Sequence, residues 1–206
     1  MLAVLAPAVA SGVGADAAAK RSDCQRLSGK DLAPSPFVKL VRKANERGGS
    51  DLVGCVLPRG SRFIVGSSGE VATRSDRYRL RQVAGRMVLV RGLHGSQYGR
   101  SENTFVSDLS TGRGYTLAFF ASPLGSPASR GMTAPVAFVT SAGRSVAALR
   151  RVDGTVTIAS FDPSGGRSDL DSGSQAQVPC ESLQLRGTIA TWRHNGAPRS
   201  ADIAAG

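Results

Sequence analysis

Aromatic, histidine and acidic residues are scarce in this chain of 206 residues. Aromatic residues make up 5% of the sequence and include one tryptophan, so stacking platforms for sugars or nucleic-acid bases have little support. The two histidines lie far apart, without Cys or acidic partners at ligand spacing, which argues against a zinc site. Hydrolase elbows, zinc-protease motifs, C-x-x-C pairs and phosphate-binding loops are also absent from the sequence. We therefore expect neither cofactor nor metal, and a protein that is not an enzyme.

Long apolar runs are missing, apart from a short one at the N-terminus. After residue 20 no apolar run approaches the roughly 18 residues of a transmembrane helix, so we expect no transmembrane anchor. Residues 2–10 form a short apolar stretch followed by small residues, which is typical of a secretory signal peptide. No Lys or Arg precedes Lys20, and a flexible Ala-rich tail is the alternative. We expect a signal peptide at 1–19, an N-terminal extension at 20–36 and a single domain at 37–206 of a secreted or extracytoplasmic protein.

Three cysteines are present, and export would permit them to form a disulfide. One bridge leaves one cysteine over, and three pairings of Cys24, Cys55 and Cys180 are possible. We favour Cys24 with Cys55, because that bridge would tie a polar N-terminal segment to the first clear strand. Three buried thiols are the alternative.

The body of the chain predicts an all-β fold. From residue 50 onward, short segments rich in Val, Ile, Leu and Thr alternate with clusters of Gly, Pro, Asn, Asp and Ser. Residues 37–43 fit either a helix beginning at Ser35-Pro36 or a strand, and we favour the strand. The other expected strands are 52–57, 62–66, 86–91, 104–109, 114–119, 135–140, 145–151, 155–161, 182–186, 188–193 and 199–204.

Burial of these strands can also be predicted from their composition. The runs at 87–90 and 136–139 are apolar at every position, which predicts burial between two layers. The segments 145–151 and 155–161 mix polar and apolar residues, which predicts half-exposed outer strands joined by a hairpin at Asp153-Gly154.

A weak repeat suggests how the strands are grouped. Polar turns marked by Gly60, Gly112, Gly166 and Gly196 recur at about 50 residues, with a shorter last interval, as propeller blades do. We expect the last unit to be completed by residues 37–43, which would close a ring without free edges.

Two stretches carry a family resemblance. Residues 140–149, with the Asp153-Gly154 turn and Phe161-Asp162 after them, resemble one blade repeat of the TolB-type bacterial propellers, and residues 103–114 resemble the outer half of another. The resemblance implies an extracytoplasmic β-propeller that binds proteins or other ligands and usually lacks chemistry of its own. The length suits a small or degenerate propeller-like stack of about three to four blades, with a β-sandwich as the alternative.

Few residues could carry chemistry. His94 lies in a glycine-rich segment at 92–99, expected to be a loop, where it could act as a base for Ser96 or be an exposed loop histidine. His194 is expected in a turn and Trp192 in the core. The segment 169–173 has the alternating carboxylates of a calcium loop, but a strand end followed by a polar loop fits better.

Basic residues are concentrated near residue 80. Arg77, Arg79 and Arg81 would point to one face of an extended chain, with Arg74 just before them. Such a strip could bind anionic envelope polymers, lipid headgroups or an acidic partner; alternatively, it is a solvated outer strand whose charge blocks aggregation. Nucleic acid is a poor partner for an exported protein without interleaved aromatics.

These observations support three hypotheses of function. The first is a secreted, non-enzymatic binding or scaffold protein whose unknown protein partner docks on the loops at 92–103 and 121–134. The second is an exported hydrolase that uses the His94 loop. The third is an envelope protein that binds a polyanion through its arginine strip.

Overall fold

The computed structural model describes residues 24, 26–33, 35–58, 60–67, 75–96, 99–123 and 130–205, so the expected signal peptide lies outside the described residues. The protein is all-β, as predicted, with one short 3₁₀ helix (η1, Cys180–Ser182) among the described residues. Within the same ranges there is no helix with the length and hydrophobicity that crossing a membrane requires. The strands are β1 Val38–Ala44, β2 Ser50–Val56, β3 Arg62–Ser67, β4 Ser75–Ala84, β5 Met87–Ser96, β6 Gly99–Asp108, β7 Gly114–Pro123, β8 Arg130–Val139, β9 Ser145–Arg151, β10 Thr155–Phe161, β11 Arg167–Ser174, β12 Gln184–Arg186, β13 Ile189–His194 and β14 Ala197–Asp202.

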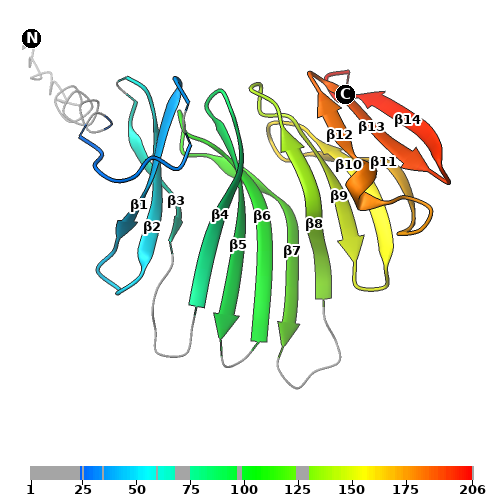
Figure 1. Cartoon of the computed structure of the whole chain (residues 1–206), viewed down its shortest axis with the longest axis horizontal. Coiled ribbons are helices and arrows are strands. Elements are labelled where there is room, and N and C mark those ends of the chain that lie inside the picture. Colours follow the sequence, from blue (N-terminus) through cyan, green and yellow to red (C-terminus); the bar gives the residue numbers. More distant parts are fainter. Residues whose placement is uncertain are drawn as a thin grey trace, which may run out of the picture.

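The strands form three sheets, and within each sheet strands that are adjacent in the sequence pair antiparallel (Figure 1). The N-terminal sheet contains β1–β3, the central sheet β4–β11 and the C-terminal sheet β12–β14. Between β7 and β8 the described pairs are only Phe120 with Gly131 and Ala121 with Arg130. This short ladder divides the curled central sheet into two meanders of four strands each, β4–β7 and β8–β11.

The sheets pack face to face in sequence order, because three apolar clusters lie between successive layers. One cluster joins the N-terminal sheet to β4–β7 through residues such as Leu40 and Val88. A second, containing Leu89 and Leu149, joins the two central meanders. A third joins β8–β11 to the C-terminal sheet through Ile158 and Trp192. The architecture is a stack of four antiparallel meanders.

The prediction for residues 87–90 is confirmed, because alternate side chains of this segment enter the clusters on opposite faces. The half-exposed prediction for 145–151 and 155–161 is wrong. Residues 146–149 are fully buried in β9, and Val156, Ile158 and Ala159 are fully buried in β10. Alanines in β9 and β10 let layers approach closely on both faces, so a mixed composition is compatible with complete burial.

Of two expectations about connections between strands, one is wrong and one is confirmed. The glycine-rich segment at 92–99 is not a loop: β5 continues to Ser96 and β6 begins at Gly99. Gly92 admits the Tyr78 ring and the Asn103 side chain so closely that a Cβ would collide with them. The Asp153-Gly154 hairpin is confirmed, with Gly154 at φ +84°.

Residues 37–43 do form a strand, since β1 covers Val38–Ala44. However, β1 pairs with β2 and lies at the opposite end of the stack from the C-terminal sheet (Figure 1). The predicted closure of a ring through this segment is therefore wrong. Pairing with β2 is favoured because the two strands are adjacent in the sequence and share a short connection.

A disulfide holds part of the N-terminal extension against the outer face of the N-terminal sheet. The predicted disulfide joins Cys24 to Cys55, at a sequence separation of 31, and among the described residues Cys180 is a buried free thiol. Cys24 and Leu27 are buried against Val41 and Val53. The described part of the N-terminal extension is thus packed on the sheet.

Candidate functional site

The arginine-rich segment forms β4, the terminal strand of the central sheet. Arg77 and Arg79 pair in register with Leu93 and Arg91 of β5, while Arg81 occupies a bulge. All three β4 arginines are exposed. The structure thus places the three predicted anion-binding residues together along one edge strand.

The arginines of β4 and β5 repel one another. Arg79 lies directly opposite Arg91, and like charges in such cross-strand pairs destabilise a sheet. Glu102 of β6 relieves part of this repulsion, since its Oε2 accepts a hydrogen bond of 2.6 Å from Nη2 of Arg91. Its side chain is 11% exposed and is paired with Arg91 and not with Arg79. Among the described side chains, no carboxylate forms an ion pair with Arg77, Arg79 or Arg81.

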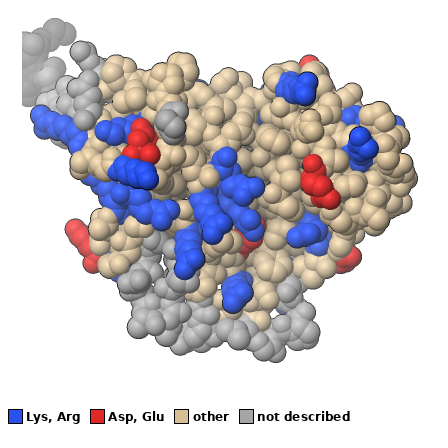
Figure 2. Space-filling model, in the orientation of Figure 1, with Lys and Arg blue, Asp and Glu red and all other residues tan. Residues whose placement is uncertain are grey.

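Backbone contacts hold two guanidinium groups at the same edge. Arg42 of β1 donates a hydrogen bond of 2.8 Å from Nη2 to the carbonyl oxygen of Tyr78, which lies between Arg77 and Arg79 in the sequence. Nη2 of Arg81 lies 3.5 Å from the carbonyl oxygen of Pro135 in β8. We call the three β4 residues Arg77, Arg79 and Arg81 the arginine strip, and Arg42 lies beside it. Figure 2 shows that basic side chains gather on one face, over the N-terminal sheet and the first central strands.

His94 does not lie in a loop. It is a half-buried residue of β5, and its ring meets the edge of Tyr78 at a centroid distance of 5.4 Å. The side chain of Ser96, the expected nucleophile, lies outside the described residues.

A polar cluster that the sequence did not predict joins β11 to β13. Asp171 accepts a hydrogen bond of 2.7 Å from Nε1 of Trp192, and both carboxylate oxygens lie 2.9 Å from Nδ1 of His194. Burial would raise the pKa of Asp171, but hydrogen bonds from Trp192, His194 and the Ser172 backbone outweigh it and lower that pKa. Trp192 is buried, as predicted, and this carboxylate is its polar partner.

The segment at 169–173 belongs to β11 and is not a calcium loop. Asp169 is paired with Arg167 at 2.6 Å, and Asp171 is occupied by the cluster just described. Across the described ranges, no group of three or more His, Cys, Asp or Glu residues is arranged to hold a metal ion. The repeated carboxylates therefore have structural partners.

No protein-family model matches this chain, and no curated protein or solved structure shows significant similarity to it. Functional inference therefore depends on the geometry of the chain itself. Among the described residues, the arginine strip is a row of exposed charges that is in part held in place.

Proposed function

We propose that this protein is an extracytoplasmic, non-enzymatic binding protein that holds a linear anionic polymer along its arginine strip. The observation that carries the proposal is the row of exposed β4 guanidinium groups, which form no ion pair with any carboxylate among the described side chains. Binding would be reversible and electrostatic. The polymer's charges would offset the repulsion between Arg79 and Arg91.

The spacing of the strip favours a repeating anion. Arg77 and Arg79 are two residues apart on one strand, so their side chains leave the sheet about 7 Å from each other. A polymer with one phosphate or carboxylate at a comparable interval can contact successive arginines. A single small anion would engage one of them, which is why we choose a polymer as the partner.

The location and the fold are part of the same proposal. A disulfide persists in oxidising compartments, and the apolar N-terminal stretch followed by small residues fits an export signal. We interpret the four meanders as blades of an open, degenerate propeller-like stack, in line with the resemblance to TolB-type repeats. Such a stack would present its β4 edge to a partner as a rigid platform.

The alternative is that the arginines only keep an edge strand from pairing with another molecule. The two ideas differ in what they predict for ligand binding. If the arginines only keep the edge strand from pairing, no ligand is needed, and neutralising them would increase aggregation of the protein. If the strip is a binding site, a polyanion must bind at these arginines and not equally at the other arginines of the protein.

The test compares two triple variants of equal charge. The first neutralises the strip (Arg77→Gln, Arg79→Gln, Arg81→Gln), and the second neutralises exposed arginines of the C-terminal sheet (Arg186→Gln, Arg193→Gln, Arg199→Gln). Affinity for long-chain inorganic polyphosphate and for polyglutamate is measured by fluorescence anisotropy across a salt series. The two polymers distinguish phosphate from carboxylate as the favoured charge.

We expect the strip variant to lose most of the affinity and the C-terminal variant to retain it. The slope of log affinity against log salt should fall by about 2 in the strip variant, since each contact contributes about 0.7 for a flexible strand. Equal losses in both variants would show that only net charge matters and would refute the site. Unchanged polymer binding with faster aggregation of the strip variant would show instead that the arginines only keep the edge strand from pairing.

A further inference from the structure

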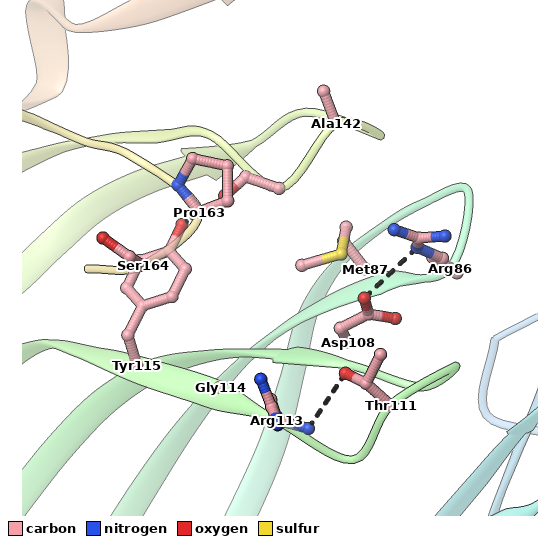
Figure 3. Close-up of a pocket in the computed structure, with 11 residues that line it drawn as sticks. Arg86, Met87, Asp108, Thr111, Arg113, Gly114, Tyr115, Ala142, Pro163 and Ser164 are labelled. Atoms are coloured by element: carbon pink, nitrogen blue, oxygen red, sulfur yellow. Dashed lines mark hydrogen bonds and ion pairs between the residues drawn. The ribbon is translucent and has the colours of Figure 1, made fainter. Parts of the chain in front are cut away.

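A second candidate site lies where four connections between strands meet. A cavity of about 540 Å³ opens between the two central meanders, within the size range of small-molecule sites (Figure 3). Its walls come from the β4–β5, β6–β7, β8–β9 and β10–β11 connections and the strand ends beside them. The lining residues used below are Arg86, Met87, Asp108, Arg113, Tyr115 and Ala142.

The rims of the cavity are fixed by hydrogen bonds within the turns. In the β6–β7 turn, Oδ1 of Asp108 accepts from the backbone N–H of Ser110 at 2.8 Å and from its hydroxyl at 2.7 Å. In the β10–β11 turn, Oδ1 of Asp162 accepts from the same two groups of Ser164, at 2.7 and 2.6 Å. The site is therefore preformed, which lowers the entropic cost of binding.

Tyr115 ties the third turn to these two. Its hydroxyl donates a hydrogen bond of 2.6 Å to the carbonyl oxygen of Gly143, in the β8–β9 turn. Burial raises the pKa of Tyr115, and the nearby Asp162 carboxylate raises it further against the opposing hydrogen bond with Ser145. The phenol is thus neutral, and its ring forms one wall.

The charges of the lining favour a monovalent anion. Nε of Arg86 lies 3.2 Å from Oδ2 of Asp108, and Figure 3 shows the guanidinium directed at this carboxylate. The backbone N–H of Arg113 donates to the hydroxyl of Thr111, while its side chain is exposed and forms no ion pair with the described carboxylates. Arg86 is paired with Asp108, so Arg113 is the lining cation that no described carboxylate pairs with. The Asp162 carboxylate at the rim accepts hydrogen bonds from the backbone N–H groups of Ser164 and Gly166.

The rest of the lining is apolar. Met87 is 5% exposed, and it lies with Ala142, Pro163 and the Tyr115 ring around the cavity. These side chains would shield an apolar body and gain from its burial. An anion without such a body would leave most of the cavity unfilled.

We infer that this cavity binds a small organic monocarboxylate, with the carboxylate at Arg113 and Arg86 and an aromatic or branched aliphatic body against Met87 and Tyr115. The site is separate from the arginine strip. It would allow the protein to bind a small molecule independently of a polymer.

Saturation-transfer NMR with benzoate, phenylacetate and hexanoate tests this inference, with benzyl alcohol and acetate as probes that lack the charge or the body. We expect the three carboxylates to bind and the two comparison probes to bind at least about tenfold more weakly. Arg113→Gln should weaken benzoate about tenfold, the loss of one charge-assisted hydrogen bond. Ala142→Phe should fill the cavity and abolish binding while retaining both arginines.

Two controls separate this site from general charge. Arg199→Gln and the strip triple variant should bind benzoate as the wild type does. Thermal unfolding verifies that the Arg113 and Ala142 variants are folded. No saturation transfer to the wild type at 10 mM probe, on the order of the weakest binding such a pocket should show, would overturn the inference. Unchanged affinity in either the Arg113 or the Ala142 variant would overturn it as well.

Discussion

The carboxylate of Asp171 links β11 of the central sheet to β13 of the C-terminal sheet, beside the apolar cluster that joins the same two sheets. It accepts the indole N–H of buried Trp192 and lies 2.9 Å from the His194 ring nitrogen. Asp171→Ala should lower the free energy of unfolding by about 1–3 kcal/mol, because it leaves the indole donor without its acceptor. Urea denaturation at pH 7 measures this loss. Asp169→Ala is the matched control on the same strand, and its exposed ion pair with Arg167 should contribute under about 1 kcal/mol.

The same residue predicts a dependence on pH. Because the folded-state pKa of Asp171 is lowered, its contribution is present above the unfolded-state value of about 3.9 and is lost as pH falls through the folded-state pKa. The difference between wild type and Asp171→Ala should therefore shrink on acidification below about pH 4. A difference that stays constant to the acid limit would contradict the assignment.

At this scale the sequence predicts some partners and misses others. The sequence favours the Cys24–Cys55 pair because this bridge would tie a polar N-terminal segment to the first clear strand, and both the segment and the strand can be recognised from composition. Asp171 and His194 are 23 residues apart in the sequence, and they come into contact only because the C-terminal sheet, with β13, packs against the central sheet, with β11. Nothing in local spacing indicates that contact, so the cluster was not foreseen.

At the scale of elements, a side chain takes the place of a missing strand pairing between β4 and β8. Nε2 of Gln82 donates to the carbonyl oxygen of Val139 at 3.0 Å, and the N–H of Val139 donates to Oε1 of Gln82 at 2.8 Å. Val139 is buried, so its backbone groups need these partners. This pair holds the curled sheet together at its β4 edge.

Gln82→Ala should therefore lower the free energy of unfolding by about 2 kcal/mol, because it leaves two backbone groups of Val139 unsatisfied. Chemical denaturation measures the change. Gln184→Ala, at an exposed position of β12, is the control and should change it by less than about 0.5 kcal/mol. Equal effects of the two substitutions would show that the amide pair does not hold β4 to β8.

Strand positions with strong apolar patterns were predictable, and those with polar sequences were less so. The run at 87–90 is apolar at every position, and its side chains do enter the apolar clusters on both faces of the sheet. By contrast, β11 has the sequence Arg-Ser-Asp-Leu-Asp-Ser-Gly-Ser and was expected only as a strand end. It is ordered by its ladder with β10 and by the Asp171 cluster, which are tertiary causes.

At the scale of the whole molecule, the described layers pack mainly against their neighbours. The three interlayer clusters share no residue, and each joins two successive meanders. Stability in such an arrangement is approximately a sum of local terms, as in repeat proteins. The grouping of strands was suggested by the spacing of turns, but closure depends on contacts between distant layers, which spacing does not encode.

This arrangement predicts that loss of the disulfide affects one end of the molecule. The double variant Cys24→Ala, Cys55→Ala removes a link at a sequence separation of 31, which should cost about 4 kcal/mol of local stability. Hydrogen exchange followed by mass spectrometry should show faster exchange in β1–β3 and unchanged protection in β9, β10 and β13. Cys180→Ala, at the buried thiol of the opposite end, should give the reverse distribution. If the Cys24 and Cys55 variant lowered protection equally in all four meanders, the molecule would unfold as one cooperative unit and not layer by layer.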